Sequence, residues 1–288
     1  MKPALFTYLR PNTVDEALGM LAEYGERAKL IAGGQSLVPM MNLRIARPEA
    51  IIDINGLKDL AYHRIDGSEL RIGAMARHSD LAESALVAKQ LPLITAAYKH
   101  VAHGTIRNRG TLCGNLSHAD PASEMPAVML VLDAQMVLRS KRGERVVPAS
   151  NFFEGMYTTA LRADEMLTEV RVPVGQSKSG FGFEEISVRQ GDYAIALVAS
   201  AVAVANGKIS AASLAFAGVS DKALRFPALE KKLIGQVPTE TLFSEVSEEA
   251  IKMIFTDTEN SDDRVYRQDL IRSLTPRALK QAVAAAAN

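Results

Sequence analysis

Two glycine-rich segments constrain this chain more than any other feature: Ala32–Met41 (AGGQSLVPMM) and Gly110–Pro126 (GTLCGNLSHADPASEMP). Glycine has no Cβ and tolerates positive φ, so each segment lets the backbone approach another group closely. Successive N–H groups exposed in such a turn form an anion-binding concavity, which the N-terminus of a helix completes best. Two such loops facing each other would suit a ligand with a diphosphate in its middle. The sequence therefore predicts a dinucleotide site.

Composition sets the outer limits. The chain has 288 residues, enough for two domains, and Lys+Arg and Asp+Glu balance at 33 each, so no net field favours nucleic acid or an anionic membrane. The single cysteine, Cys113, excludes an internal disulfide and an iron–sulfur cluster held by this chain alone. No apolar run approaches the roughly 20 residues that span a bilayer, and Met1–Pro11 lacks the pattern of a secretory signal. We expect a cytoplasmic protein without an integral membrane segment.

Hydrophobic patterns predict a βαβ-like unit around the first glycine segment, because a strand, the glycine loop, a short helix and a second strand follow one another. Thr13, with Glu16 in the capping-box position, predicts the start of a preceding helix. In the first half we predict helices over 13–22, 37–43, 79–86 and 91–100 and strands over 28–32, 50–54 and 69–74. In the second half we predict strands over 128–132, 135–139, 145–148, 165–173, 182–188, 195–205 and 211–219 and helices over 239–255 and 265–287, with Gly175–Gly180 as the linker.

The common nucleotide fingerprints are missing. No G-x-G-x-x-G follows a strand, and Gly175–Gly180 has Phe181 where a Walker lysine belongs. Gly34-Gln35-Ser36 begins like a nucleophile elbow, but Val38 replaces its second glycine. The chain therefore has the loops for a dinucleotide without the Rossmann or the P-loop pattern.

Four motifs in order resemble a known family. They are A-G-G-Q-S-L-x-P-x-M-x-x-R (Ala32–Arg44), R-N-R-G-T-L-x-G-N-L-x-H-A-D-P-A-S-E-x-P (Arg107–Pro126), D-E-x-L-T-E-V-R-V-P (Asp164–Pro173) and R-x-G-D-Y-A (Arg189–Ala194). Together they resemble the FAD-binding medium subunit of molybdenum hydroxylases, such as carbon monoxide dehydrogenase, with the flavin domain of xanthine dehydrogenase more distant. The likeness runs almost from end to end of the chain.

The resemblance implies an α+β protein with the two-subdomain FAD-binding fold of the vanillyl-alcohol-oxidase (PCMH-type) superfamily. It implies an FAD-binding domain over 1–176, with subdomains of about 1–55 and 56–176, and a C-terminal domain of antiparallel sheet and helices over 178–288. Backbone groups of the two loops would hold the FAD diphosphate, Glu124 would bond a ribose hydroxyl, Leu167 would pack on a ring, and Tyr193 would lie beside the isoalloxazine. The implied cofactor-binding residues are Ala32, Gly33, Gly34, Gln35, Ser36, Leu37, Ala102, Thr111, Leu112, Gly114, Asn115, Glu124, Leu167 and Tyr193.

Two residues depart from the family pattern. Cys113 stands where relatives often have glycine, so either it takes a glycine-like conformation or positive φ is not required there. Glu185 stands where many relatives have lysine, which would alter the electrostatics near the flavin. His100, His103 and His118 are close enough in sequence to suggest a metal, but hydrogen bonding in loops explains them better. The basic residues of 107–109 fit a solvated loop or a subunit contact better than nucleic-acid binding.

The function implied is that of an electron-transfer subunit. The chain would take electrons from [2Fe–2S] clusters on a small partner subunit and pass them to an external acceptor, while a large partner subunit hydroxylates substrate at molybdopterin, in a dimer of heterotrimers. Carbon monoxide, N-heterocycles and aromatic thioesters stay open as substrates of the large subunit. The alternatives are a stand-alone FAD oxidase or dehydrogenase of the same fold and a non-enzymatic nucleotide-binding protein. No catalytic acid–base pair and no metal ligand in this chain is expected.

Overall fold

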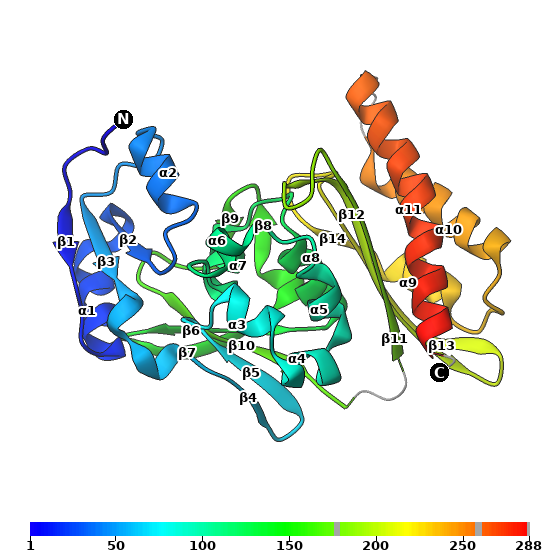
Figure 1. The fold of residues 1–288 in the computed structure, drawn as a ribbon, viewed down its shortest axis with the longest axis horizontal. Coiled ribbons are helices and arrows are strands. Elements are labelled where there is room, and N and C mark those ends of the chain that lie inside the picture. Colours follow the sequence, from blue (N-terminus) through cyan, green and yellow to red (C-terminus); the bar gives the residue numbers. More distant parts are fainter. Residues whose placement is uncertain (176–178, 257–260, 287–288) are drawn as a thin grey trace.

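The computed structural model describes residues 1–175, 179–256 and 261–286, and three parts of mixed helix and sheet follow one another along the chain (Figure 1). The first part has a three-stranded sheet, the second a five-stranded sheet, and the third a four-stranded sheet with the longest helices. The predicted α+β class is confirmed.

The first part is a parallel sheet in the order β1-β3-β2. Its elements are β1 (Thr7–Leu9), α1 (Val14–Tyr24), β2 (Ala28–Ile31), α2 (Leu37–Asn42) and β3 (Ala50–Asp53), with 3₁₀ turns over Gly25–Arg27 and Ile54–Gly56. Thr13 caps α1 by accepting a hydrogen bond from the Glu16 backbone N–H at 3.1 Å. The predicted βαβ-like unit is present, because β2 and β3 are parallel neighbours joined through α2.

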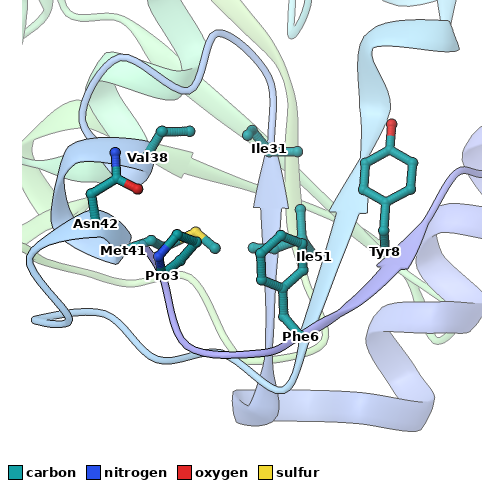
Figure 2. Close-up of a pocket in the computed structure, with 8 residues that line it drawn as sticks. All are labelled: Pro3, Phe6, Tyr8, Ile31, Val38, Met41, Asn42 and Ile51. Atoms are coloured by element: carbon teal, nitrogen blue, oxygen red, sulfur yellow. The ribbon is translucent and has the colours of Figure 1, made fainter. Parts of the chain in front are cut away.

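One face of this sheet is covered by α1, and the opposite face carries an apolar pocket of about 130 Å³ (Figure 2). Register places Tyr8 of β1 opposite Ile51 of β3, and both line the pocket. The lining residues are Pro3, Phe6, Tyr8, Ile31, Val38, Met41, Asn42 and Ile51. Tyr8 remains 55% exposed and Val38 41% exposed, so α2 and the N-terminal residues cover this face only in part.

The second part is an antiparallel sheet in the order β4-β5-β10-β6-β7, with short helices packed on it. Its strands are β4 (His63–Asp66), β5 (Glu69–Gly73), β6 (Gln135–Ser140), β7 (Gly143–Pro148), the small pair β8 (Phe153–Gly155) and β9 (Thr158–Thr159), and β10 (Met166–Pro173). Its helices are α3 (His78–Ala82), α4 (Ala85–Gln90), α5 (Pro92–Ala97), α6 (Gly104–Arg107), α7 (Leu112–His118) and α8 (Glu124–Val131), with 3₁₀ turns over Lys58–Leu60 and Ala149–Asn151.

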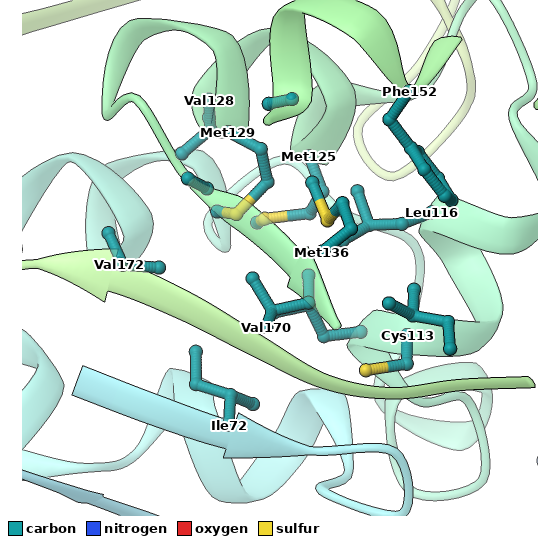
Figure 3. Close-up of a cluster of buried hydrophobic side chains, with 14 of the residues drawn as sticks. Ile72, Cys113, Leu116, Met125, Val128, Met129, Met136, Phe152, Val170 and Val172 are labelled. Carbon is teal, nitrogen blue, oxygen red and sulfur yellow. The ribbon is translucent and has the colours of Figure 1, made fainter. Parts of the chain in front are cut away.

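The core of the second part lies between its sheet and the helices α7 and α8 (Figure 3). Cys113 and Leu116 of α7 and Met125 of α8 meet Val170 of β10 there. Every residue of α8 is buried, because the helix is also covered by β12 (Ala194–Ala205) and β13 (Lys208–Ala217) of the third part. Helix α8 is therefore enclosed between the second and the third sheet.

The third part is an antiparallel sheet in the order β11-β12-β13-β14 with three helices. Its elements are β11 (Ser179–Ser187), β12 (Ala194–Ala205), β13 (Lys208–Ala217), β14 (Leu224–Arg225), α9 (Pro227–Leu233), α10 (Glu240–Ile254) and α11 (Asp262–Ala286). Alternate residues of β12 face the two sides, so Leu197 and Ala199 join the core of the second part while Val198 packs beneath the helices of the third. The sheet is therefore buried on both faces.

Helix α11 lies unusually close to the sheet. A Cβ on Gly180 would stand 2.0 Å from the carbonyl oxygen of Ala282, and one on Gly182 would stand 1.9 Å from that of Ala278. Ser200 of β12 donates a hydrogen bond to the same Ala278 carbonyl at 3.0 Å. Only glycine at these two strand positions allows this packing.

The third part is also bonded directly to the loop before α8. The Ala194 N–H donates to the Ala122 carbonyl at 3.2 Å, and the Gly218 N–H donates to that of Pro121 at 2.9 Å. Arg225 reaches the far end of α8 and donates to the Leu130 carbonyl at 2.7 Å. These contacts hold the start of β12 beside the second glycine segment.

Several local predictions need correction. The strand predicted over 128–132 is wrong: these residues belong to the end of α8 and the turn after it, and because all sides of α8 are buried the apolar run has no readable period. The helix predicted over 79–86 is two helices, α3 and α4, and the one over 91–100 ends at Ala97. Strands β1, β4, β8, β9 and β14 and helices α6, α7 and α9 were not predicted. Of the predicted linker, residues 176–178 lie outside the described residues, and β11 begins within it.

Candidate functional site

The first glycine segment forms a loop, here called loop 1 (Ala32–Ser36), between β2 and α2. Gly34 has a left-handed φ of +71°, and a Cβ there would lie 3.2 Å from side-chain atoms of Ile31 and Val38. Ser36 is the N-cap of α2, but its side chain makes no capping hydrogen bond. The Ser36 hydroxyl is therefore not used to cap α2.

The second glycine segment begins with loop 2 (Asn108–Thr111), which joins α6 to α7. The Thr111 hydroxyl caps α7 by accepting a hydrogen bond from the Gly114 N–H at 3.1 Å. The Asn115 amide donates to Ser123 at 2.8 Å, which connects α7 to the start of α8.

The two loops are in backbone contact. A Cβ on Gly33 would stand 2.3 Å from the carbonyl oxygen of Arg109 and 2.6 Å from the Cα of Gly110. Real Cβ atoms do not approach backbone so closely, so only glycine at position 33 lets the loops meet. The structure thus places face to face two segments that are distant in sequence, as a shared ligand requires.

A side-chain bridge holds the loops together. Arg77, at the start of α3, donates to the Arg109 carbonyl through Nη1 and to the Asn55 side-chain oxygen through Nη2 at 2.7 Å. The Asn55 amide in turn donates to the Ala32 carbonyl at 2.7 Å. One guanidinium and one amide therefore connect a carbonyl of loop 1 with a carbonyl of loop 2.

Asp53 holds Asn55, the amide of this bridge, in place through hydrogen bonds. Its Oδ1 accepts hydrogen bonds from Asn55, from the backbone N–H at 2.9 Å and from the side-chain amide at 2.6 Å, and its Oδ2 accepts one from the Tyr8 hydroxyl. Partial burial alone raises the pKa of the Asp53 carboxyl, but the hydrogen bonds from Tyr8 and Asn55 outweigh it and the net pKa is lowered. Asp53 is therefore an ionised acceptor at neutral pH.

His78 supports loop 2 from the core. Its backbone N–H donates to the Gly110 carbonyl at 3.0 Å, and a Cβ on Gly110 would stand 2.9 Å from the imidazole. The ring lies 3.1 Å from the Tyr98 hydroxyl through Nδ1. Burial lowers the pKa of His78 to about 4, so the imidazole is neutral near pH 7.

An acidic cluster lies between α8 and β11. Glu124 is only 4% exposed, and burial, followed by the negative charge of Glu185, raises its pKa to about 8. Both carboxylate oxygens of Glu185 are buried and have no hydrogen-bond partner within the described residues. The nearest cation is His100, whose Nδ1 lies 3.6 Å from Glu185 Oε1 and whose pKa is raised chiefly by this polar contact with the Glu185 carboxylate.

The remaining predicted site residues divide into two groups. Tyr193 is 53% exposed, and burial, followed by the negative charge of Asp120, raises its pKa to about 12. Ala102 has a left-handed φ of +46°, and its carbonyl would lie 3.0 Å from a Cβ on Gly191, two residues before Tyr193. Leu167 lies on β10 opposite Leu138 and is 3% exposed.

Cys113 does not take the glycine-like backbone conformation that its place in the family motif could have required. It lies in α7 without a positive φ, so the backbone there does not require glycine. Its thiol is 2% exposed, and burial raises its pKa. The side chain is therefore a neutral member of the core shown in Figure 3.

Sequence reasoning missed Arg77 and Asn55. A signal for Asn55 was available, because Asp53-Ile54-Asn55 ends a predicted parallel strand next to the strand that leads into loop 1. Carboxyl ends of parallel strands share one edge of a sheet, where ligand sites collect. Nothing in the sequence indicated Arg77, which reaches the loops from the start of α3 in the second part.

Membrane-spanning helices and metal-binding groups are both absent from the described part of the chain. No described helix is long and apolar enough to cross a membrane. No group of three or more His, Cys, Asp or Glu side chains within residues 1–175, 179–256 and 261–286 is arranged to hold a metal ion.

Comparison with known proteins gives two family matches. Residues 4–175 match the family described as the FAD binding domain in molybdopterin dehydrogenase. Residues 181–282 match the one described as the CO dehydrogenase flavoprotein C-terminal domain.

Individual relatives match over nearly the whole chain. The beta subunit of caffeine dehydrogenase from Pseudomonas sp. (strain CBB1) is 38% identical over 98% of this chain and 96% of its own length. The carbon monoxide dehydrogenase medium chain of Hydrogenophaga pseudoflava is 36% identical over 98% of both chains. Among solved structures, carbon monoxide dehydrogenase from H. pseudoflava superposes with a TM-score of 0.94 at 36% identity over 99% of both chains. Quinoline 2-oxidoreductase from Pseudomonas putida 86 gives 0.92 at 33% identity over the full length of both.

Proposed function

This chain belongs to the family of the FAD binding domain in molybdopterin dehydrogenase, and on that premise we propose that it is the FAD-binding electron-transfer subunit of a heterotrimeric molybdenum hydroxylase. It takes electrons from [2Fe–2S] clusters of a small partner subunit and delivers them to an external acceptor. Substrate is hydroxylated at molybdopterin on a large partner subunit. The relatives named above are dehydrogenases, so the chain is part of an oxidoreductase.

The backbone contact between the two loops carries this proposal. Gly33 against Arg109 and Gly110 makes a cradle without side chains, which a single Cβ would fill. Loop N–H groups on both sides suit the oxygens of a diphosphate, and FAD has its diphosphate at the centre of an extended molecule. The residues present therefore fit FAD.

The proposed roles of the residues follow the two loops. Loop 1 and the first residues of α7 hold the diphosphate, Glu124 and Leu167 serve the ribose and a ring, and Tyr193 lies beside the isoalloxazine. The hydrogen bond from the Ala194 N–H to the Ala122 carbonyl supports the role of Tyr193, because it holds the start of β12 beside the second glycine segment. The full proposed set is Ala32, Gly33, Gly34, Gln35, Ser36, Leu37, Ala102, Thr111, Leu112, Gly114, Asn115, Glu124, Leu167 and Tyr193. The FAD-binding domain spans 1–176 and the C-terminal domain 178–288.

FAD, when bound, exchanges one or two electrons and so couples unlike redox centres. The other centres belong to other chains, because Cys113 is the only cysteine and a [2Fe–2S] cluster needs several ligands. The protein assembles as a dimer of heterotrimers in the cytoplasm.

The test is the visible spectrum of the purified full chain, alone and after addition of FAD, with the heat-released cofactor identified by chromatography. We expect one non-covalent FAD per chain. Co-expression with candidate small and large subunits and capture through this chain then tests the assembly.

No flavin under either condition, including co-expression with the small subunit, would contradict the proposal. Flavin that stays attached after denaturation would favour the stand-alone oxidase instead. Reduction of bound FAD by the reduced iron–sulfur subunit, followed as bleaching of the visible absorption of oxidised flavin, tests the direction of electron flow.

A further inference from the structure

Arg77 has an unusual position for an arginine. It is half-buried, and its two Nη groups donate to the Arg109 carbonyl of loop 2 and to Asn55, which holds loop 1. No carboxylate of the described residues forms an ion pair with it, although Asp53 and Asp80 are near enough to act through their charge. A half-buried guanidinium whose hydrogen-bond partners are neutral has no direct counter-charge in contact with it.

Neighbouring residues add to this charge. Arg109 in loop 2 is exposed and, within the described residues, is not part of an ion pair. Its charge and the burial of Arg77 both lower the pKa of Arg77, burial being the larger cause. Arg107 donates to the carbonyls of Val101 and Ala102, at 2.8 and 2.7 Å, and also has no carboxylate partner in that part of the chain. Positive charge therefore gathers where the two loops meet, in a chain whose net charge is zero.

Unbalanced charge at this junction needs a counter-charge. Arginine binds phosphate through charge-assisted hydrogen bonds that are stronger than neutral ones. A diphosphate seated on the N–H groups of the two loops brings negative charge close to Arg77. The same guanidinium fixes the spacing of the loops, since it joins the Arg109 carbonyl to the amide that holds the Ala32 carbonyl.

We propose that Arg77 is a positioning residue for the dinucleotide: with Asn55 it sets the separation of the two glycine loops, and its charge balances the diphosphate that they receive. The inference rests on the proposed function and goes beyond the loop residues assigned there. It makes two separable statements, one about geometry and one about charge.

Three variants of the full chain separate them. Arg77→Met removes both the bridge and the charge, Arg77→Lys keeps the charge but loses the fork that reaches two partners, and Asn55→Ala keeps the charge but cuts the link to loop 1. The matched control is Arg142→Gln, an arginine in the turn between β6 and β7 whose side chain is 61% exposed and paired with Asp164.

The dissociation constant for FAD is measured by flavin fluorescence at two salt concentrations, beside the melting temperature of each apo-protein. We expect Arg77→Met to weaken FAD binding about 10- to 100-fold, the range for loss of a hydrogen bond to a charged group. Arg77→Lys and Asn55→Ala should lie between it and the wild type. The salt dependence should shrink only in Arg77→Met, because counter-ion screening acts on the charge. A purely structural role would not separate the Lys and Met variants.

Arg77→Met that binds FAD within about twofold of the wild type would overturn the inference, as would Lys and Met variants with equal affinity and equal salt dependence. A control variant that loses as much affinity as Arg77→Met would also overturn it. Wild-type protein that binds no FAD speaks against the proposed function instead, so the two failures are distinguishable. If Arg77→Met does not fold, the inference is tested by the FAD affinity of Arg77→Lys, compared with the affinities of the wild type and of Arg142→Gln.

Discussion

The two glycine loops meet at one junction but are supported in different ways. Loop 2 is built into the core: Thr111 caps its own helix, and His78 packs beneath Gly110. Loop 1 has no such capping bond, because Ser36 is the N-cap residue of α2 but its side chain accepts no hydrogen bond from that helix. Its support comes from elsewhere, through Asn55 and through the contact of Gly33 with loop 2.

This difference separates stability from binding. Groups that support loop 2 also support the core, so changing them should lower the free energy of unfolding. The Ser36 hydroxyl contributes little to folding, so changing it should alter cofactor affinity while leaving stability intact. The predictions below test that division.

Gly33→Ala should have the largest effect, because it breaks the contact between the loops. The added Cβ would meet the Arg109 carbonyl at 2.3 Å, so the loops must separate. We expect a loss of about 3 kcal/mol in the free energy of unfolding and loss of FAD binding, measured by urea unfolding and FAD titration. The control is Gly19→Ala in α1, where a Cβ meets nothing within 4 Å and helix propensity should add up to about 1 kcal/mol. Equal behaviour of the two variants would refute the contact.

Loop 2 should show an acid-sensitivity that loop 1 lacks. Burial lowers the pKa of His78 from 6.5 to about 4, so its stabilisation is present above pH 6.5 and is lost as pH falls toward 4. The loss should approach about 3 kcal/mol at pH 4, measured by unfolding at a series of pH values, and should be absent in His78→Gln. Asp53, which supports loop 1, has a lowered pKa and loses its contribution only as pH falls below its ordinary value of 3.8. Matching pH profiles for the wild type and His78→Gln would contradict this assignment.

Removal of the α7 cap should have a moderate effect on stability. Thr111→Ala leaves the Gly114 N–H without its acceptor and should cost about 1 kcal/mol in the free energy of unfolding. Thr239→Ala is the matched control, because Thr239 caps α10 in the same way through the Leu242 N–H at 3.2 Å. Both should lose similar stability, but only Thr111→Ala should weaken FAD binding. An FAD affinity lowered equally by both would show that the effect is not local.

Ser36→Ala should have the smallest effect on folding. Its hydroxyl makes no capping bond, so we expect a change within about 0.5 kcal/mol in the free energy of unfolding. The affinity for FAD should nevertheless fall roughly 3- to 10-fold, since one neutral hydrogen bond is removed. Differential scanning fluorimetry with and without FAD measures both. A large loss of stability without ligand would mean that loop 1 depends on this hydroxyl.

Local chemistry explains what the sequence could predict. The cap at Thr13, the strand over 195–205 and the strand–loop–helix–strand order around loop 1 are each determined by neighbours in sequence, and all were predicted. Helix α8 was mistaken for a strand over 128–132, because burial on all sides removes the amphipathic period. The bridge from Arg77 was invisible because it joins residues 32, 55, 77 and 109, which only tertiary structure brings together. The glycines were found because their backbone requirements are local.

Tyr8 gives the site a connection to the outer surface. Its hydroxyl donates to Asp53, Asp53 holds Asn55, and Asn55 holds the carbonyl of Ala32 and the guanidinium that reaches loop 2. The ring of Tyr8 lines the pocket on the open face of the first sheet (Figure 2). A molecule that settled on that face and turned Tyr8 aside would remove the hydrogen bond that Tyr8 donates to Asp53. Any effect of that displacement on dinucleotide affinity would be matched, through thermodynamic linkage, by an equal effect of the dinucleotide on binding at the outer face.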